Sequence, residues 1–543
     1  MMRCFIVLSV LVLGACSPDR ADDQDGSPAE APRDMSAELL DASPSDSDML
    51  ALVRPSIEHP CARVSSPAPY PRGVPYLTVH ANPQNNDRVP CAVSGPWRPG
   101  WHALRGKPIA QPNTFSPDGL TTYVTTALRS DADCSVFALD VETGEQRWCR
   151  SIPGAINSAV AVDQRGHLYI ASESSIVSLD AGGAERWTTE FYTTEPQAVG
   201  AHFTPHGELA TVTQDGTVYL LSRGDGEVLG RLDLASALGF VDPKGARAAG
   251  GDRIREQLGD DLELLFGDAL DDSSGTFFGS SGKFTNNTIA VDPSGNLYVT
   301  GGGPDEDNGT VIQVMIERDE EGVTLRPGFY IPLHGFSAAS PVISPDGRWL
   351  KTSDGVATGA VSDAFIQLVE LSRCPPAGAC QPTYTIALDG AQLGASPVLD
   401  GAVHLRWETS LARIGEQTSR DLVKMRGEEV VWELDLPDSM TWSSVLTITD
   451  DYILGTATHI TLSSEKIFSF TLPETATSEL LVVSRADGSI VYRYPVTDDS
   501  SATVTVGPDG SLYVGMLALV HALAKETRPV AGLMKFSPLG APK

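Results

Sequence analysis

Short runs of strand-forming residues recur along the chain, each directly after a tight turn. Glycine at the end of such a turn permits positive φ, and proline at its second position presets φ, so each turn predicts a link between antiparallel strands. The runs that follow, such as His167-Leu-Tyr-Ile170 and Asn296-Leu-Tyr-Val299, predict the second strand of each pair. Six turns carry this pattern: Ser116-Pro-Asp-Gly119, Asp163-Gln-Arg-Gly166, Thr204-Pro-His-Gly207, Asp292-Pro-Ser-Gly295, Ser344-Pro-Asp-Gly347 and Gly507-Pro-Asp-Gly510.

A second predicted hairpin follows in most of these repeats. Its turns lie within Leu179 to Trp187, Leu221 to Leu229, Met425 to Trp432 and Val483 to Tyr492. Repeats spaced by about 40 to 60 residues, each of several strands, are typical of propeller blades. We therefore predict an all-β β-propeller of eight blades over residues 113–543. Seven blades remain an alternative, because the units at Gly394 and Thr441 lack the turn signature. The units begin near Asn113, Ile156, Gln197, Asn286, Ser337, Gly394, Thr441 and Ser501.

One hairpin identifies the kind of propeller that the sequence resembles. The segment Ala138-x-Asp140-x-x-Thr143-Gly144-x-x-x-Trp148 resembles the tryptophan-docking motif of the pyrroloquinoline quinone repeat propellers. In that family the tryptophan packs between neighbouring blades, and the alanine, aspartate and glycine shape the turn that receives such a ring. The resemblance implies that Trp148 is a structural wedge. Trp187 follows a version of the motif that is one residue shorter, and Tyr492 replaces the tryptophan in a third hairpin.

The same hairpin begins and ends in cysteine. Cys134 and Cys149 lie at similar distances from the turn, so folding the hairpin sets them opposite each other, with Cβ atoms roughly 4.5 to 5.5 Å apart. Small adjustments bring such a pair to disulfide geometry in an oxidising compartment. Sequence neighbours suggest two further pairs, Cys61 with Cys91 and Cys374 with Cys380, although six cysteines also allow other connectivities.

The N-terminus provides evidence of that compartment. A short basic start, an apolar run from Phe5 to Leu13 and the sequence Leu13-Gly-Ala-Cys16 resemble a bacterial lipoprotein signal. The resemblance implies that residues 1–15 are a signal peptide and that Cys16 becomes the lipidated first residue. Ser17, rather than aspartate, favours the outer membrane by similarity to sorting in enteric bacteria. A plain secretory signal with a chance cysteine is the alternative.

Composition limits the partners. The chain has 543 residues with 70 acidic and 39 basic side chains, for a net charge of −31. This charge argues against binding to nucleic acid or to anionic lipid headgroups. Part of the acidity lies between Asp19 and Asp48, where no apolar periodicity occurs. We therefore expect residues 16–59 to be a disordered acidic tether.

Two segments fall outside the blade pattern. Residues 60–112 are rich in proline and aromatic residues and aperiodic, and they include Tyr76-Leu-Thr-Val-His-Ala-Asn-Pro-Gln-Asn-Asn-Asp87. We expect them to form a cap on the first blade or a strand that closes the ring. An insertion near 235–285 has apolar residues Ile254, Leu258, Leu262 and Leu265 at helical spacing, which predicts a short amphipathic helix. That helix is either a lid or partner-binding element or a surface helix on its own propeller.

No pattern along the chain defines a catalytic or metal site. His202 and His206 have the spacing of helical metal ligands, but Pro205 and the turn at Gly207 exclude that helix. No Ser, His and Asp set can be assembled from the sequence.

The resemblance implies two alternative functions. The first is a non-catalytic, protein-binding scaffold similar to the outer-membrane assembly lipoproteins, with no cofactor and with other envelope proteins as partners. The second is a quinoprotein dehydrogenase that binds pyrroloquinoline quinone and Ca²⁺ at the propeller axis. Many such dehydrogenases have two adjacent cysteines against the quinone, and this chain has no Cys-Cys pair. We therefore expect the scaffold, on the periplasmic side or the cell surface.

Overall fold

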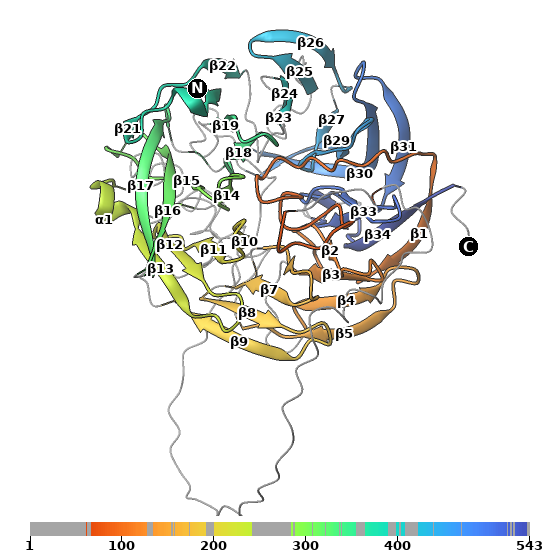
Figure 1. Cartoon of the computed structure of the whole chain (residues 1–543). Coiled ribbons are helices and arrows are strands. Elements are labelled where there is room, and N and C mark those ends of the chain that lie inside the picture. The colour runs from red at the N-terminus through yellow and green to blue at the C-terminus, as the bar shows by residue number, and fades with distance from the viewer. Residues whose placement is uncertain are drawn as a thin grey trace, which may run out of the picture.

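The strands are arranged in eight sheets around one centre (Figure 1). The structure is a computed structural model, which describes residues 61–539 with internal gaps. The gaps are 62–66, 127–133, 154–155, 157, 173, 192–199, 242–283, 286–287, 307, 321, 336, 338, 354–363, 389–397, 401–402, 408–421, 438, 468–469, 519, 522–523 and 525–526.

Each sheet is one blade. The blades are numbered I to VIII by the position in the sequence of their innermost strand, from β2 in blade I to β32 in blade VIII. Blade I is β2 (Thr114–Phe115), β3 (Thr121–Thr125), β4 (Val136–Asp140) and β5 (Gln146–Arg150); blade II is β6 (Ala161–Val162), β7 (Leu168–Ala171), β8 (Ser175–Leu179) and β9 (Glu185–Glu190). Blade III is β10 (His202–Phe203), β11 (Leu209–Val212), β12 (Thr217–Leu221) and β13 (Val228–Asp233); blade IV is β14 (Ala290–Val291), β15 (Leu297–Gly301), β16 (Thr310–Asp319), β17 (Gly322–Pro332) and an added β21 (Gly378–Ala379).

The remaining four blades repeat the arrangement. Blade V is β18 (Val342–Ile343), β19 (Trp349–Ser353), β20 (Ala364–Glu370) and β22 (Tyr384–Leu388); blade VI is β23 (Val398–Asp400), β24 (Val403–Trp407), β25 (Leu422–Arg426) and β26 (Glu429–Leu434). Blade VII is β27 (Met440–Trp442), β28 (Thr447–Ile448), β29 (Tyr452–Ile467), β30 (Phe470–Ser484) and β31 (Ile490–Val496); blade VIII is β32 (Thr505–Val506), β33 (Leu512–Met516), β34 (Gly532–Pro538) and β1 (Trp97–Ala103).

The structure confirms the all-β propeller and decides between seven and eight blades. The units expected near Gly394 and Thr441 are separate sheets, blades VI and VII, so eight is correct. The turn glycines have the conformation that the sequence predicts, because Gly119, Gly166 and Gly295 have φ of 70°, 79° and 91°. These turns join the first and second strands of their blades.

Burial changes from the centre of each sheet to its edge. In blade II the strands β7 and β8 are buried along their whole length, whereas β9 has one buried residue, Trp187, and is otherwise exposed or half-buried. Each blade packs against a neighbouring blade on both of its faces. Side chains on both sides of a central strand are therefore buried, so these strands are continuous apolar runs such as Leu168-Tyr-Ile-Ala171 rather than alternating apolar and polar residues. The outer strands form the rim of the ring (Figure 1).

Helix is scarce in the part of the chain that the structure describes. It contains α1 (Leu234–Leu238), which Asp233 caps through a bond from the Ser236 amide, and the 3-10 turn Leu371–Arg373. The amphipathic helix expected from Ile254 to Leu265 lies outside the described residues. No helix among the described residues is long and apolar enough to cross a membrane.

The ring is closed by a strand from the N-terminal block. β1 pairs antiparallel with β34, with Trp97 opposite Pro538 and Ala103 opposite Leu533. Blade VIII therefore combines its first three strands from the C-terminal end of the chain with an outer strand from residues 97–103. This pairing joins the two ends of the propeller without a covalent link.

We predict that a chain beginning at Gln111 is much less stable than one beginning at Pro60. The shorter chain lacks β1, which exposes the edge of β34 and removes the buried Trp97 side chain from the core. It also lacks residues 67–93, which hydrogen-bond to several blades. Its melting temperature is expected to fall by about 10 °C or more in thermal unfolding followed by circular dichroism. Equal melting temperatures for the two chains would show that β1 does not close the ring.

Candidate functional site at the ring axis

The predicted docking residues lie at the contact between blades I and II. The Trp148 ring packs against Gly183, and its Nε1 donates to the Ala181 carbonyl at 3.0 Å. Trp187 repeats this contact between blades II and III, where its ring lies against Gly226 and its Nε1 donates to the Arg223 carbonyl at 3.3 Å. Each ring therefore occupies space that the glycine leaves by having no side chain.

The turn residues of the motif shape the neighbouring hairpin. Asp140 accepts hydrogen bonds from the amides of Glu142 and Thr143, at 3.0 and 2.9 Å, and Arg147 holds the pKa of this carboxyl down at about 2. Ala138 is buried and lies opposite Trp148 across β4 and β5. Gly144 has a φ of 73° and receives a ring from blade VIII.

Two docking tryptophans were not identified from the sequence. Trp101 of β1 packs on Gly144, and its Nε1 donates to the Val141 carbonyl at 3.1 Å. Trp432 of β26 packs on Gly488 in the same manner, with its Nε1 3.3 Å from the Arg485 carbonyl. The available signal was the tryptophan itself, at the end of a Gly-containing hairpin in β26 and within Trp97-Arg-Pro-Gly-Trp101.

The structure contains the three disulfides. Cα atoms lie 4.9 Å apart for Cys61 and Cys91, 5.6 Å for Cys134 and Cys149, and 5.0 Å for Cys374 and Cys380. The register expected for the second pair was wrong, because Phe137 rather than Cys134 lies opposite Cys149. The turn closes between Asp140 and Glu145, later than a pairing of Cys134 with Cys149 requires, and a bulge between Ala138 and Leu139 adds one more residue to the shift. Cys134 reaches its partner from the residues before β4. Cys16 lies outside the described residues.

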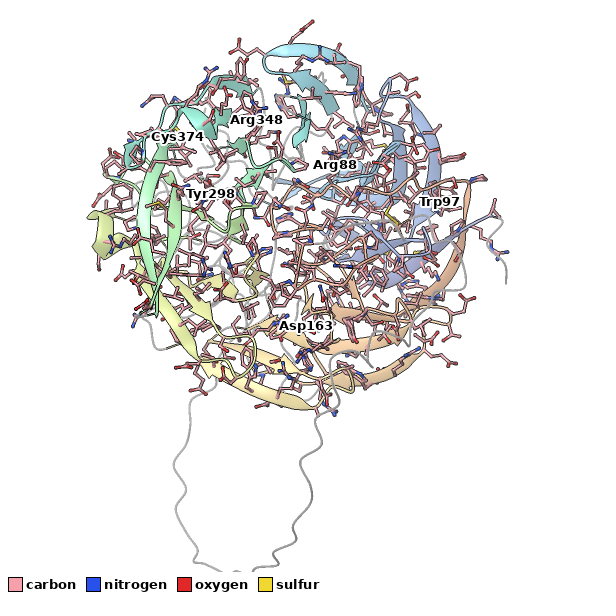
Figure 2. All side chains as sticks on the ribbon, viewed as in Figure 1. Arg88, Trp97, Asp163, Tyr298, Arg348 and Cys374 are labelled. Atoms are coloured by element: carbon pink, nitrogen blue, oxygen red, sulfur yellow. A yellow bond between two sulfur atoms is a disulfide. The ribbon has the colours of Figure 1, made fainter. Side chains whose placement is uncertain are left out.

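The centre of the ring is filled by the chain itself. Residues 67–93, called the axial loop from here on, contact the first strands or adjoining residues of blades II, III, IV, V, VII and VIII. Figure 2 shows Arg88 of this loop near the middle of the ring. Carbonyls of the loop accept backbone hydrogen bonds from Gln164 (to Pro69), Val291 (to Pro83), Ile343 (to Gln84), Ile448 (to Asp87) and Asp450 (to Cys91), at 2.7 to 3.1 Å.

Side chains of the loop add further bonds to the same strands. The Asn85 amide donates to the Ile289 and Pro341 carbonyls at 2.8 and 3.2 Å, which links blades IV and V. Tyr70 accepts from the Phe203 amide at 3.0 Å. The loop is therefore tied to the inner surface of the ring along both its main chain and its side chains.

Local sequence explains the tight path of the axial loop. Ala81, Asn85 and Asp87 have positive φ, of 63°, 57° and 49°. Asn and Asp tolerate this region better than most residues, which suits the run Asn82-Pro-Gln-Asn-Asn-Asp87. The Cys61–Cys91 disulfide joins the C-terminal part of the loop to Cys61, which precedes the loop in the sequence, and so closes this part of the chain on itself.

A buried polar group lies within the loop. His80 Nδ1 is 3.0 Å from Asp87 Oδ2, and His80 Nε2 is 3.1 Å from the hydroxyl of Ser340. Tyr76 donates to the other oxygen of Asp87 at 3.3 Å and also bonds the Thr503 hydroxyl. Burial raises the pKa of Asp87 above its ordinary value, and the neighbouring His80 opposes this shift.

Ser340, His80 and Asp87 are connected by hydrogen bonds in the same order as the serine, histidine and aspartate of a hydrolase triad. The sequence alone gave no sign that these three residues lie together. Ser340 is only 1% exposed, however, and the next residue, Pro341, has no N–H group to stabilise an oxyanion. The hydrogen bond between His80 and Ser340 connects the axial loop to blade V. We assign them to anchoring rather than to catalysis.

Two more histidines are buried, His202 in β10 and His404 in β24. Burial and the nearby His80 lower the pKa of His202 to about 3, and burial and the nearby Lys351 lower that of His404 to about 3. His202 Nε2 lies 2.9 Å from the Thr288 hydroxyl, and His404 Nε2 lies 3.0 Å from the Gly427 carbonyl. Both side chains are therefore neutral at pH 7. His206, considered with His202 above, is exposed in a turn.

Comparisons with known proteins agree with the propeller. A sequence model of the family described as "Outer membrane protein assembly factor BamB" matches residues 98–254, which include β1 and blades I to III. This is less than half of the chain. A search of curated protein sequences found no match.

Solved structures extend the likeness to most of the chain. Quinohemoprotein alcohol dehydrogenase from Comamonas testosteroni has 10% identity and a TM-score of 0.51, with 89% of this chain and 84% of that chain covered. A europium-containing methanol dehydrogenase has 12% identity and a TM-score of 0.50, covering 86% and 98%. BamB from Moraxella catarrhalis has 13% identity and a TM-score of 0.43, covering 82% and 98%. Identities this low show the fold alone.

We predict that acid destabilises the protein through His202 and His404. Each has a folded-state pKa below its ordinary value, so the unfolded chain binds protons that the native state excludes, and stability falls as pH drops below about 6.5. Between pH 7 and pH 5 the loss is about 2 kcal/mol per histidine. The measurement is guanidinium unfolding at both pH values.

Glutamine keeps a nitrogen near the position of Nε2 but does not titrate. His202→Gln and His404→Gln should each reduce the loss on acidification by about 2 kcal/mol. His206→Gln, at an exposed position, is the matched control and should leave the loss unchanged. If the two buried variants lose as much stability as the wild type, the histidines are not the source of the pH dependence.

Proposed function

We propose that this protein is a lipid-anchored propeller of the bacterial envelope that acts as a non-catalytic scaffold for other proteins. The observation that carries the proposal is the axial loop, which holds the centre of the ring through hydrogen bonds to six blades. The family match to an outer membrane protein assembly factor supports the same assignment. Partner proteins would then bind at the rim or on the two faces of the ring.

The residues at the axis do not fit a quinone with Ca²⁺. Such a site needs an open space for the ring system and several carboxylate or amide oxygens directed at the ion. Asp87, the acid of the axial loop, is engaged by His80 and Tyr76, and the amide of Asn85 donates to two carbonyls of the blades. In addition, no group of three or more metal-ligating side chains occurs among the described residues.

The N-terminal sequence supports the proposed location. Cys16 stands directly after an apolar run and Leu13-Gly-Ala, as in a lipoprotein signal, and the three disulfides suit an oxidising compartment. The acidic residues between Cys16 and Pro60 then tether the ring to the membrane. We place the protein at the outer membrane, on the periplasmic side or at the cell surface.

The purified protein is expected not to bind pyrroloquinoline quinone. Titration with the quinone in the presence of Ca²⁺ should show no saturable binding at micromolar concentrations, because the axial loop already bonds the inner strands. Dye-linked oxidation of alcohols and sugars should remain at the level of a protein-free control. Quinone binding with turnover would overturn the scaffold assignment in favour of a dehydrogenase.

Crosslinking in intact envelopes tests the scaffold directly. We expect mass spectrometry to recover outer-membrane assembly or secretion proteins with the wild type, and fewer of them with Cys16→Ser, which cannot be lipidated. Ser17→Ala is the matched control and should behave as the wild type does. Equal recovery with Cys16→Ser would remove the lipid from the proposal, and recovery of no envelope protein with any variant would contradict the scaffold.

A further inference from the structure

The rim of the ring is a series of edge strands, and the protein itself shows that one of them accepts an added strand. In blade IV the segment β21 pairs in parallel with the outer strand β17, with Phe329 opposite Gly378 and Tyr330 opposite Ala379. The Cys374–Cys380 disulfide encloses this short strand. Strand addition at the rim is therefore compatible with this fold.

The outer strands of five blades share a β-bulge, and the type of residue at the bulge differs between blades. Each of five outer strands has a bulge, and the residue left without a register partner is Arg147 in β5, Arg186 in β9, Leu229 in β13, Val431 in β26 and Val491 in β31. In blades I and II the arginine is hydrogen-bonded, Arg147 to Asp140 at 2.7 Å and Arg186 to Ser178 at 2.7 Å. Arg186 also donates to the Gly224 carbonyl of blade III at 3.2 Å. In blades VI and VII the position carries valine instead.

These valines lie on the outer strands of two neighbouring blades. Val430 and Val431 of β26 are 40% and 47% exposed, and Val491 of β31 is 45% exposed. Trp432 connects the two strands, because its ring packs on Gly488 in the turn before β31. We call Val430, Val431 and Val491 the valine patch.

The charged side chains on β26 itself are acidic. The exposed side chains Glu428, Glu429 and Glu433 lie at or beside β26, and Asp487 lies in the turn before β31. Lys424, Arg426, Arg485 and Arg493 are basic side chains at this junction. Lys424 donates to the Arg485 carbonyl at 3.0 Å, and Arg493 pairs with Glu479 at 3.1 Å. Residues 428–435 carry four acidic and no basic side chains, so the edge formed by β26 is itself acidic, and the whole chain has a net charge of −31.

β26 itself is an open edge. Its sheet runs in the order β23-β24-β25-β26, and among the described residues no strand pairs with the outer side of β26. The strand Glu429-Val-Val-Trp-Glu-Leu434 contains neither proline nor lysine, the residues that commonly protect edges, whereas its neighbour β31 contains Pro495. Its glutamates would repel those of a second copy but attract a basic chain.

We propose that the outer edge of β26, with the valine patch, binds an extended, basic segment of a partner protein as an added strand. Main-chain hydrogen bonds to β26 supply affinity, apolar side chains of the segment cover Val431 and Val491, and its Lys or Arg residues face Glu429 and Glu433. This proposal rests on the scaffold function and names the surface through which it acts.

The test uses the full chain and a fluorescein-labelled Lys-Val-Lys-Val-Lys-Val peptide as the ligand. Fluorescence anisotropy is expected to show saturable binding, and hydrogen exchange is expected to slow at the amides of residues 429–434. Val431→Arg and Val491→Arg should each weaken binding at least tenfold. Both variants place arginine where blades I and II already carry it, so the fold should accommodate them.

Val228→Arg is the matched control, because Val228 is a 44% exposed valine on the outer strand of blade III. It should bind the peptide as the wild type does, and a Glu-Val-Glu-Val-Glu-Val peptide should not bind. If all three variants bind the peptide as well as the wild type does, the binding comes from general attraction between a basic peptide and an acidic protein, and the proposal is wrong. Absence of binding up to millimolar peptide would overturn it as well.

The envelope crosslinking described above separates the two proposals. If envelope partners are recovered but their contacts map away from residues 429–434 and 491, the scaffold stands and the β26 site is wrong. If the protein instead binds quinone and turns over, the scaffold itself fails, whatever the peptide does.

Discussion

The inner strands of a ring of blades are themselves edge strands, and their unpaired backbone groups must be satisfied. In this protein those groups face a crowded centre, where an unpaired N–H or C=O is costly. The axial loop supplies partners, since Val291, Ile343 and Ile448 donate to carbonyls of Pro83, Gln84 and Asp87. The centre of the ring is thus completed by residues that belong to no blade, and the loop and the ring depend on each other.

A second constraint operates at the rim, where blades meet through an aromatic ring and a glycine. The contacts of Trp101, Trp148, Trp187 and Trp432 each require a glycine at the receiving turn, because a Cβ there would lie 2.5 to 3.0 Å from the ring. Blade III has Gly230 in place of the aromatic residue, and Leu325 of β17 packs there instead. Because Trp101 belongs to β1, ring closure uses the same contact as the other junctions.

The fold was predictable from the sequence because its signals are local. A turn glycine such as Gly166, and the buried run that follows it, lie within a few residues of each other, and so do Gly144 and Trp148 in the docking motif. The axial loop was not predictable, because its contacts join distant residues: Tyr76 meets Thr503, 427 positions away. Its sequence carries Asn, Asp and Pro at turn positions but no periodicity. The same limit hid the grouping of His80, Asp87 and Ser340.

Because the axis is filled by the axial loop, the strands of a blade are not equally free to differ in sequence from those of other blades. Residues at the centre are constrained by hydrogen bonds to the loop, and the middle strands by stacking on both faces, so the outer strands are the freest to differ. They do differ, since the bulge position is a hydrogen-bonded arginine in blades I and II and an exposed valine in blades VI and VII. An exposed apolar position at an open, acidic edge contributes little to the stability of its own blade. The proposed contact with another chain gives these positions a role that the ring itself does not require.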